Sequence, residues 1–578
     1  MRKLLTYLKD YRKESILAPL FKMLEASFEL FIPLVVASII DKGIGGSDKA
    51  YIYRMGLVMI LLGVIGLACS VTAQYFSAKA AVGFTAKVKS ELYRHIQSLS
   101  YTELDQLGTS ALITRMTSDM NQVQTGINLT LRLLLRSPFV VFGAMIMAFT
   151  VNAKAAFVFV VIIPLLCVVV FGIMLFNIPM YRKVQGRLDR VLELTRENLT
   201  GARVLRAFNK QNDEIGRYRE STEELNKVQM FAGRVSGLMN PVTYVIINGG
   251  IIALIWSGAI QVDQGSISQG QLTALVNYMS QILVELIKMA NLIISITKAV
   301  ACGNRIQAVF DLKSSMEYGT LRNPHTDQTS PILTFQNVGF RYPGASEELL
   351  SDLSFTVNDG EMVGIIGGTG AGKTALVDLV ARFYDATRGE IRLMGHDIRD
   401  YEEKSLRQMI GIVPQNVMLF QGTIEDNLRW RKKDAASEEI DRALEISQAK
   451  EFVQRRPKGL QTWIRQGGKN FSGGQKQRLT IARAIVGNPK ILILDDSASA
   501  LDFATDAKLR MALRGMKPAP TVFLVSQRAS SVRYANKIIV LDDGAVAGIG
   551  THNELLKSCP VYQEIYYSQF PKGGGDHR

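Results

Sequence analysis

The sequence predicts a chain of two parts, an α-helical membrane domain with six spans followed by an α/β domain of the P-loop type. Three observations predict this division. Apolar runs long enough to cross a bilayer, about 20 residues each, occur in the N-terminal half and not in the C-terminal part. Strand-like and helix-like patterns alternate from Leu333 onward. A glycine-rich stretch separates a strand-like run from an amphipathic run within 363–380.

The apolar runs predict six spans and a regular pattern of loops. The outer loops are short, and the turn between the third and fourth spans falls at Asn152–Lys154. The inner loops 81–135 and 181–240 are long, polar and helical in pattern, so the membrane helices should continue far into water; 25 extra residues would reach about 40 Å. The predicted spans lie near 15–40, 56–80, 136–152, 155–180, 242–262 and 268–300.

The formal net charge of +15 is explained by the inner loops. A basic protein can bind nucleic acid, but the segment 181–240 alone carries twelve Lys and Arg residues, which is the distribution of cytoplasmic loops in membrane proteins. We therefore expect no nucleic-acid partner. We expect a multi-pass protein of the cytoplasmic (inner) membrane, in contact with lipid, with both termini and the α/β domain in the cytoplasm.

Composition also predicts the domain boundaries. We expect a membrane domain over 1–312 and an α/β domain over 333–572. The polar, turn-rich stretch 313–332 should be a linker, and the glycine-rich tail 573–578 should be disordered.

The glycine-rich stretch matches the spacing of a P-loop. Its glycines allow several backbone N–H groups to face phosphates, and the N-terminus of the following helix adds positive potential. Lys373 should contact the β- and γ-phosphates of ATP, and Thr374 should bind Mg²⁺. The predicted phosphate contacts are Gly367, Gly368, Thr369, Gly370, Ala371, Gly372, Lys373 and Thr374.

Residues 491–496 read as a buried strand that ends in two acids. Asp495 suits the Walker-B role, in which a carboxylate at the end of a strand holds Mg²⁺ through its water shell. Together with the P-loop, this pattern predicts a site for ATP and Mg²⁺.

With these motifs in place, the chain resembles the ATP-binding cassette (ABC) transporter family over its whole length. Four further sequences carry the resemblance, in the family's order. Tyr342, in Phe-Arg-Tyr-Pro, resembles the aromatic residue that stacks on adenine, and Gln415, in Val-Pro-Gln, resembles the Q-loop glutamine that reaches Mg²⁺. The stretch Phe471-Ser472-Gly473-Gly474-Gln475 resembles the family's signature, and Ser499-Ala500-Leu501-Asp502 resembles its D-loop.

The resemblance implies an exporter-type half-transporter, in which six spans precede one ABC cassette. In that family two cassettes face each other head to tail, and each ATP lies between one chain's P-loop and the other chain's signature. This chain would therefore need a second half-transporter. The long inner loops would supply coupling helices, which we place near Leu107–Met116 and Leu199–Ala207.

Two positions depart from the family pattern, and both concern hydrolysis. The family usually has Glu after the Walker-B aspartate, where this chain has Asp496, and usually has His in the switch loop, where this chain has Gln527. This matches heterodimeric exporters with one degenerate, slow site, whose partner carries Glu and His. The alternative is neutral drift at the two positions, or an active site that tolerates both residues. In either case Asp496, Gln527 and Gln415 are the candidate catalytic residues.

Ionisable residues in the first span leave the substrate open. Ionisable groups at membrane depth often face a cavity, so Glu25 and Glu29, one turn apart, could form a surface that attracts cations. The favoured alternative is that Lys22 and Glu25 neutralise each other. In the sixth span, a polar series could line the pathway or bond to neighbouring helices; it comprises Asn277, Gln281, Glu285 and Lys288.

Three functions remain open at this point. The leading hypothesis is a heterodimeric ATP-driven exporter of amphipathic compounds such as drugs, lipids or peptides. The second is an importer on the same fold for an iron–siderophore type of substrate. The third is an ATP-gated channel or regulator that does not pump.

Overall fold

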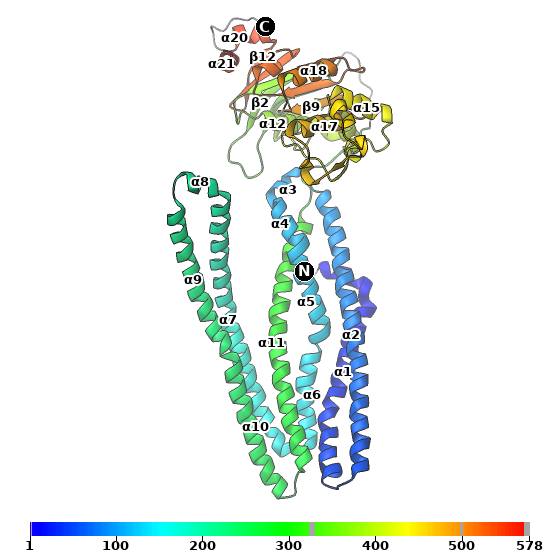
Figure 1. Ribbon diagram of the computed structural model, residues 1–578, viewed down its shortest axis with the longest axis vertical. Coiled ribbons are helices and arrows are strands. Elements are labelled where there is room, and N and C mark those ends of the chain that lie inside the picture. Colours follow the sequence, from blue (N-terminus) through cyan, green and yellow to red (C-terminus); the bar gives the residue numbers. More distant parts are fainter. Residues whose placement is uncertain (2, 323–329, 498–500, 571–578) are drawn as a thin grey trace. The chain divides into compact units, whose positions relative to one another are not determined.

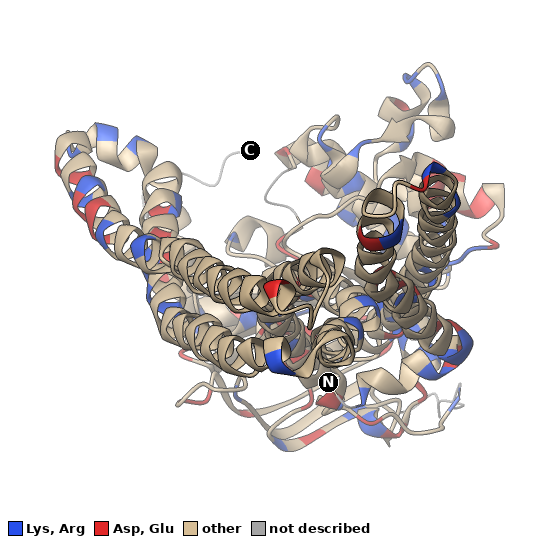
Figure 2. Ribbon diagram, turned by 90° about the horizontal axis from the view of Figure 1, so that it is seen from below, with Lys and Arg blue, Asp and Glu red and all other residues tan. Residues whose placement is uncertain are grey.

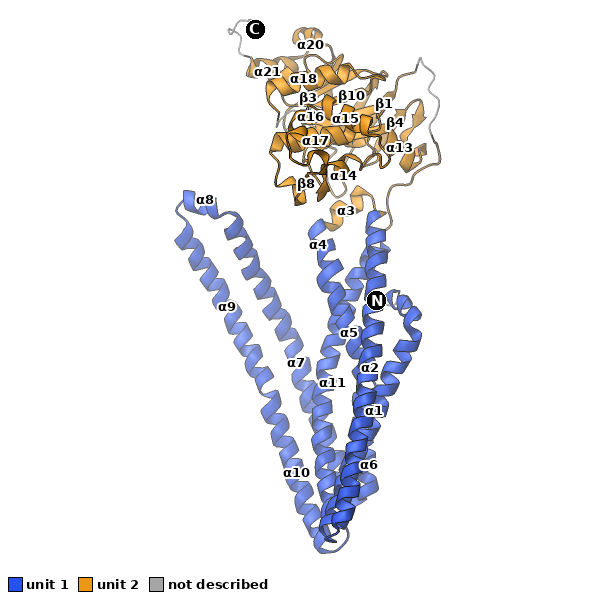
Figure 3. Ribbon diagram, turned by 45° about the vertical axis from the view of Figure 1, so that its right-hand side comes forward, with its two compact units in different colours: residues 1–97, 109–312 blue, residues 98–108, 313–578 orange. Residues whose placement is uncertain are grey.

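The computed structural model describes residues 1, 3–322, 330–497 and 501–570. It divides into two compact units (Figures 1 and 3). The first unit comprises Met1–Gln97 and Thr109–Leu312, and the second comprises Ser98–Gly108 and Lys313–Arg578. The predicted tail 573–578 and the D-loop positions Ser499 and Ala500 lie outside the described residues.

The first unit is helical, and six of its continuous helical stretches are long and apolar enough to cross a membrane, within the described ranges. This confirms the six predicted spans. The long helices are α1 (Arg12–Ser38), α2 (Lys49–Gln97), α5 (Met120–Leu133), α6 (Arg136–Val151), α7 (Ala153–Thr200), α9 (Gln211–Gly237), α10 (Met239–Asp263) and α11 (Gln269–Asp311). The short ones are η1 (Leu4–Tyr11), η2 (Ile39–Ile44), α4 (Thr109–Thr114), η3 (Arg115–Asp119) and α8 (Ala202–Ala207).

Helix caps fix the starts of two of the membrane helices. Asn152 leaves the helical conformation between α6 and α7, and its side chain accepts a hydrogen bond from the N–H of Ala155 at 2.9 Å. Such a cap satisfies a donor that the first turn of a helix would otherwise leave unpaired. Ser268 caps α11 in the same way. The predicted break between the third and fourth spans is therefore confirmed at Asn152, whereas Lys154 already belongs to α7.

Several helices are much longer than a bilayer is thick. Helix α2 has 49 residues and α7 has 48, so each is about 70 Å long, against a hydrocarbon core of about 30 Å. Basic and acidic residues lie along the paired helices α7 and α9, on the left of Figure 2. The helices thus continue beyond the bilayer, as the polar inner loops predicted.

The second unit is built on two main sheets. A six-stranded sheet has the order β12-β11-β3-β10-β9-β6, in which only β12 runs antiparallel to its neighbour, and a four-stranded antiparallel sheet has the order β2-β1-β4-β5. The strands are β1 (Leu333–Phe340), β2 (Leu350–Val357), β3 (Met362–Gly367), β4 (Arg388–Leu393), β5 (His396–Asp397), β6 (Ile410–Val413), β7 (Gly422–Thr423), β8 (Trp463–Ile464), β9 (Ile491–Asp495), β10 (Thr521–Val525), β11 (Lys537–Asp542) and β12 (Ala545–Gly550).

Helices surround the parallel strands of the second unit. Strands β3, β9 and β10 are buried at every position, as expected when both faces of a parallel sheet are covered. The helices are α3 (Tyr101–Leu107), α12 (Lys373–Val380), α13 (Glu403–Met409), α14 (Ile424–Leu428), α15 (Ser437–Ile446), α16 (Lys450–Gln454), α17 (Gly473–Ile485), α18 (Phe503–Arg514), α19 (Ala529–Val532), α20 (His552–Ser558) and α21 (Pro560–Gln569).

The first coupling-helix position predicted from the sequence is wrong. The segment that packs within the cassette unit is Ser98–Gly108, which carries α3, and it overlaps the expected Leu107–Met116 at only two residues (Figure 3). The reason is a cap: Ser100 and Glu103 form a capping box that starts a helix earlier in the loop. The second expected stretch, Leu199–Ala207, contains the short helix α8.

Candidate functional site

A cavity of about 260 Å³ opens at the carboxyl ends of the parallel strands. Adjacent strands β3, β10, β9 and β6 end there, so loops from distant parts of the sequence meet, as is usual for ligand sites in α/β sheets. The cavity gathers most of the residues predicted from the sequence. Its predicted lining residues are Tyr342, Thr369, Gly370, Gly372, Lys373, Thr374, Gln415, Asp495, Asp496 and Gln527.

The turn between β3 and α12 requires glycine at specific positions. Gly370 and Gly372 have φ angles of +84° and +87°, a region that side chains disfavour. A Cβ atom at Gly372 would lie 2.4 Å from a methyl carbon of Leu350, and one at Gly367 would lie 2.2 Å from the carbonyl oxygen of Leu541. The loop can therefore curl tightly only with these residues, which leaves its backbone facing the cavity.

Lys373 and Thr374 begin helix α12 directly after this turn. The Lys373 ammonium donates to the carbonyl oxygens of Gly367, at 3.0 Å, and Gly368, at 2.5 Å. Burial lowers the pKa of Lys373, partly offset by Asp495 and Asp496. The lysine is thus held over the loop, where a phosphate would compete for it.

Asp495 is the last residue of β9 and is 4% exposed. Its carboxylate accepts a hydrogen bond from the Thr374 hydroxyl at 3.1 Å, and burial raises its pKa. Carboxylate and hydroxyl oxygens together are a donor set that Mg²⁺ prefers. The two residues fit the metal that the sequence predicted.

Asp496 and Gln527 follow the carboxyl ends of two paired strands, β9 and β10. Val525, the last residue of β10, pairs in register with Asp495, and its carbonyl oxygen accepts a hydrogen bond from the N–H of Asp496 at 3.1 Å. Asp496 has a φ of +44°, a conformation in which Asp is enriched among non-glycine residues. Gln527 lines the same cavity. The structure therefore places both departures from the family pattern beside the P-loop.

The signature residues lie at the start of another helix. Ser472 caps the 13-residue helix α17, and its backbone N–H donates to Gln475 Oε1 at 3.2 Å in a capping box. Ser472 and Gly473 are exposed. Among the described residues that line the P-loop cavity, none belongs to the signature.

Tyr342 belongs to an aromatic cluster that the sequence did not reveal. Its ring makes edge contacts with Phe340 and Tyr384, with centroids 4.8 and 5.3 Å apart. The hydroxyl of Tyr384 donates to Asp105 Oδ2 at 2.5 Å, and Asp105 lies on α3. Burial, and then the carboxylates Asp495 and Asp105, raise the pKa of the nearby Asp378 to about 7. No hydrophobic periodicity or sequence motif pointed to Tyr384 or Asp105, because their contact joins segments 279 residues apart.

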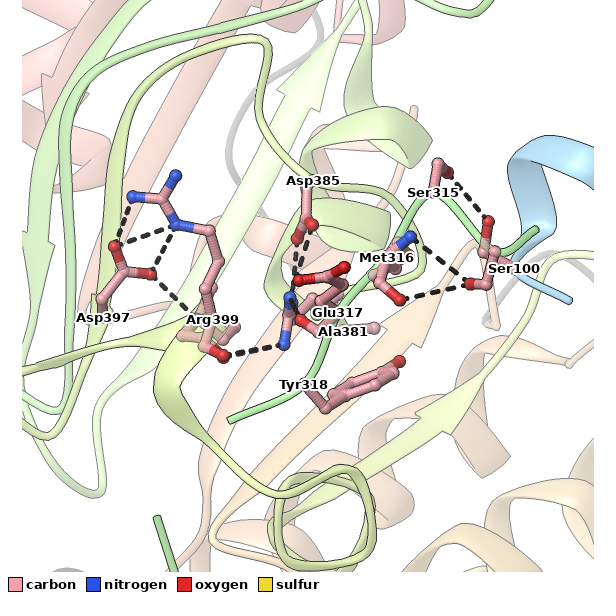
Figure 4. Close-up of polar contacts among 12 residues, drawn as sticks. Ser100, Ser315, Met316, Glu317, Tyr318, Ala381, Asp385, Asp397 and Arg399 are labelled. Atoms are coloured by element: carbon pink, nitrogen blue, oxygen red, sulfur yellow. Dashed lines mark hydrogen bonds and ion pairs between the residues drawn. The ribbon is translucent and has the colours of Figure 1, made fainter. Parts of the chain in front are cut away.

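The chain that follows α11 is fixed to the cassette by a buried arginine (Figure 4). Arg382, 1% exposed, follows helix α12 and donates to the carbonyl oxygen of Glu317 at 2.6 Å and to Asp385 at 2.8 Å. Its guanidinium lies over the ring of Tyr318, 4.5 Å from the centroid. Ser315 in turn donates its N–H to Glu103 of α3. The first ten residues of the predicted linker are therefore anchored rather than loose.

The ionisable residues that the sequence singled out in the first and sixth spans form ion pairs. Lys22 lies 2.5 Å from Glu25, which confirms the favoured neutralising pair. Arg136, a residue that the sequence analysis missed, bonds to both Glu29 and Glu285 at 2.6 Å. An unpaired acidic surface that attracts cations is therefore not what the described residues form.

The sixth-span series divides between packing and exposure. Glu285 is 3% exposed and also accepts from Ser137 and Lys288. Asn277 is exposed. Glu285 thus joins helices α11 and α6, and it does not line an open pathway in this chain.

A P-loop cavity in an α/β unit, joined in one chain to six candidate membrane helices, defines a multi-pass membrane protein with a nucleotide-binding domain. Two family descriptions agree. "ABC transporter transmembrane region" matches residues 15–286, and "ABC transporter" matches residues 350–499.

Comparison of the whole chain gives the same family. An uncharacterized ABC transporter ATP-binding protein of Mycobacterium tuberculosis is 36% identical over 97% of this chain and 97% of its own length. The ATP-dependent lipid A-core flippase of Vibrio vulnificus is 26% identical over 99% of this chain and 98% of its own. The chain belongs to the ABC transporter family, with a membrane domain fused to an ATP-binding domain.

A solved structure shows the exporter type of fold. A bacterial Atm1-family ABC exporter with ATP bound has a TM-score of 0.79 at 24% identity, covering 98% of this chain and 99% of that chain. The predicted class of protein and the predicted fold are therefore confirmed.

Proposed function

We propose that this chain is one subunit of a heterodimeric ATP-driven exporter of amphipathic compounds, such as drugs, lipids or peptides, in the cytoplasmic membrane. Its own ATP site binds nucleotide and hydrolyses it slowly. Its signature completes the competent site of a different partner chain that carries Glu and His. The observation that carries the proposal is one cavity holding an intact set of binding residues beside Asp496 and Gln527.

The binding half of the site supports ATP with Mg²⁺. Lys373 and the P-loop backbone would hold the phosphates, while Thr374 and Asp495, 3.1 Å apart, would hold the metal with Gln415. Tyr342 would stack on adenine. When bound, Mg²⁺ would neutralise charge on the transferred phosphoryl group.

The hydrolytic half of the site supports slow turnover. Asp is one methylene shorter than Glu, so its carboxylate falls more than about 1 Å short of the attacking water, and such a displacement can cost about 100-fold in rate. Gln527 can donate a hydrogen bond to the γ-phosphate, but it carries no positive charge.

Exposed surfaces of the chain support a two-chain assembly. The signature residues Ser472 and Gly473 face solvent rather than the chain's own P-loop cavity. The cassette also exposes Phe420 stacked on Trp430, with ring centroids 3.9 Å apart. Val204 of helix α8 and Phe208, which follows that helix, are exposed as well. Large apolar side chains grouped on a surface are typical of protein interfaces.

The first test uses the purified chain without a partner. It should bind Mg-ATP saturably, because the binding residues are intact, yet hydrolyse it about 100-fold more slowly than an ordinary transporter ATPase. Equilibrium binding of a fluorescent ATP analogue and steady-state phosphate release measure the two properties.

Lys373→Ala is the control that should remove binding. Turnover of several molecules per second by the unmodified chain would overturn the slow-site assignment. Transport into inside-out vesicles by the two-chain complex tests export, since an importer would move the same compound outward from the vesicle and a channel would move it without accumulation.

A second test concerns the base. Tyr342→Ala should weaken ATP binding at this site by roughly 5- to 150-fold, because base–aromatic stacking contributes roughly 1–3 kcal/mol in nucleic-acid complexes. Tyr342→Trp keeps an aromatic face and should bind like the parent chain. Equal affinities for all three chains would show that Tyr342 has only a packing role.

A further inference from the structure

The hydroxyl of Tyr384 connects the adenine side of the cavity to the loop between the second and third membrane helices. Tyr384 is 8% exposed, and its ring stands at 90° to the ring of Tyr342, with centroids 5.3 Å apart. Its hydroxyl donates to Asp105 of α3 at 2.5 Å. A ring that is packed edge-on against a neighbour restricts how that neighbour can tilt.

We propose that Tyr384 and Asp105 are positioning residues for nucleotide binding, which hold the ring of Tyr342 at the tilt that stacks on a purine base. The loop helix α3 thereby contributes to base recognition without touching the base. The proposal rests on the stacking role of Tyr342 proposed above.

Contacts other than the Asp105 hydrogen bond already attach α3 to the cassette. The Asp105 bond is therefore not needed for that attachment, and it can act on the orientation of Tyr384. The ring of Tyr101 stacks on Phe383 with centroids 4.6 Å apart. Glu103 accepts the N–H of Ser315 at 3.1 Å. Both contacts hold the helix and neither involves Tyr342.

The electrostatics keep the Tyr384 hydroxyl a donor. Burial and the hydrogen bond to Asp105 raise its pKa, and burial with the carboxylates Asp378 and Asp105 raises the pKa of Tyr342. Both phenols therefore stay protonated, and the hydroxyl of Tyr384 keeps pointing its proton toward Asp105.

Thermodynamic linkage adds a second consequence. If packing of α3 against the cassette, with the Asp105–Tyr384 hydrogen bond formed, favours ATP binding, then bound ATP must favour that packing by the same factor. ATP should therefore slow the exchange of the backbone amides of Tyr101–Leu107, and it should do so only while the Tyr384 hydroxyl is present.

The test compares ATP with Mg-tripolyphosphate, which lacks the base and the sugar, on the purified full chain. Tyr384→Phe and Asp105→Ala should each weaken ATP binding by about 5-fold, the equivalent of one lost hydrogen bond. Neither should change the affinity for Mg-tripolyphosphate. Because both break the same contact, the double variant should be no weaker than either single variant.

Glu103→Gln is the matched control, since it alters the attachment of α3 but not the contact with Tyr384; its ATP affinity should stay within 2-fold of the parent. Tyr384→Phe with unchanged ATP affinity would overturn the proposal. So would an equal loss for both ligands, which would mark a general structural defect, or retention of the ATP-dependent amide protection of α3.

Tyr342→Ala in the same assay separates the two levels of the argument. If it binds ATP like the parent, the stacking role itself fails. If it loses affinity while Tyr384→Phe does not, only the positioning role fails.

Discussion

Replacement of Ser472 by arginine should remove nearly all ATP hydrolysis by the assembled two-chain complex. The serine hydroxyl, the backbone N–H groups that follow it and the N-terminus of α17 would stabilise the charge that develops on the γ-phosphate of the partner's ATP. Loss of one preorganised donor costs about 100- to 1,000-fold in rate in other enzymes. A bulky side chain at Gly474 should act in the same way.

Asp496→Asn is the matched comparison, because it changes the proposed slow site and leaves the signature intact. Most of the ATPase activity should remain in that complex. Phosphate release by co-purified complexes measures both variants, and co-purification shows that assembly is unaffected. Loss of activity in Asp496→Asn with retention in Ser472→Arg would reverse the assignment of the two sites.

Arg382→Met should lower the free energy of unfolding of the cassette by about 3–5 kcal/mol. The substitution removes one partner of an ion pair whose guanidinium is buried, and it takes from Asp385 and from the carbonyl oxygens of Glu317 and Ile398 the donor that Arg382 supplies. Thermal unfolding of the detergent-solubilised chain, followed with and without Mg-ATP, measures the change through the transition that ATP stabilises.

Arg399→Met gives the control from the same neighbourhood (Figure 4). Arg399 pairs with Asp397, but its side chain is 56% exposed, and exposed ion pairs contribute about 0–1 kcal/mol. The control should therefore unfold within a few degrees of the parent. If the two variants unfold alike, Arg382 does not anchor the chain after α11.

Most of the fold could be predicted because its signals are local. Apolar runs of bilayer length gave the six spans, and a helix cap at Asn152 marked the tightest turn. The P-loop residues could be identified because a tight turn with positive φ at Gly370 and Gly372 accepts few other side chains. These features depend on neighbours in the sequence, so the sequence alone carries them.

The missed residues depend on distant partners. A charged residue within an apolar run, such as Arg136, can be noticed in the sequence. Its role as an ion-pair partner, however, depends on Glu29 and Glu285, which lie on two other helices. Tyr384 carries no periodic signal, because its role follows from Asp105. The position of α3 was misjudged for the same reason: attachment to the cassette, rather than polarity or length, decides which part of the loop forms the contact.

The membership of Ser98–Gly108 in the cassette unit has a consequence for synthesis of the chain. A ribosome makes Tyr101 and Asp105 long before their partners Phe383 and Tyr384, since 279 residues separate Asp105 from Tyr384. At a synthesis rate of roughly 5–20 residues per second, the residues that α3 packs against are made on the order of 15–60 s after α3 itself. During that interval the membrane helices on both sides of it can insert. A cassette fragment produced without α3 would expose Phe383 and Tyr384, so it should aggregate more readily than the same fragment supplied with a peptide of residues 98–108.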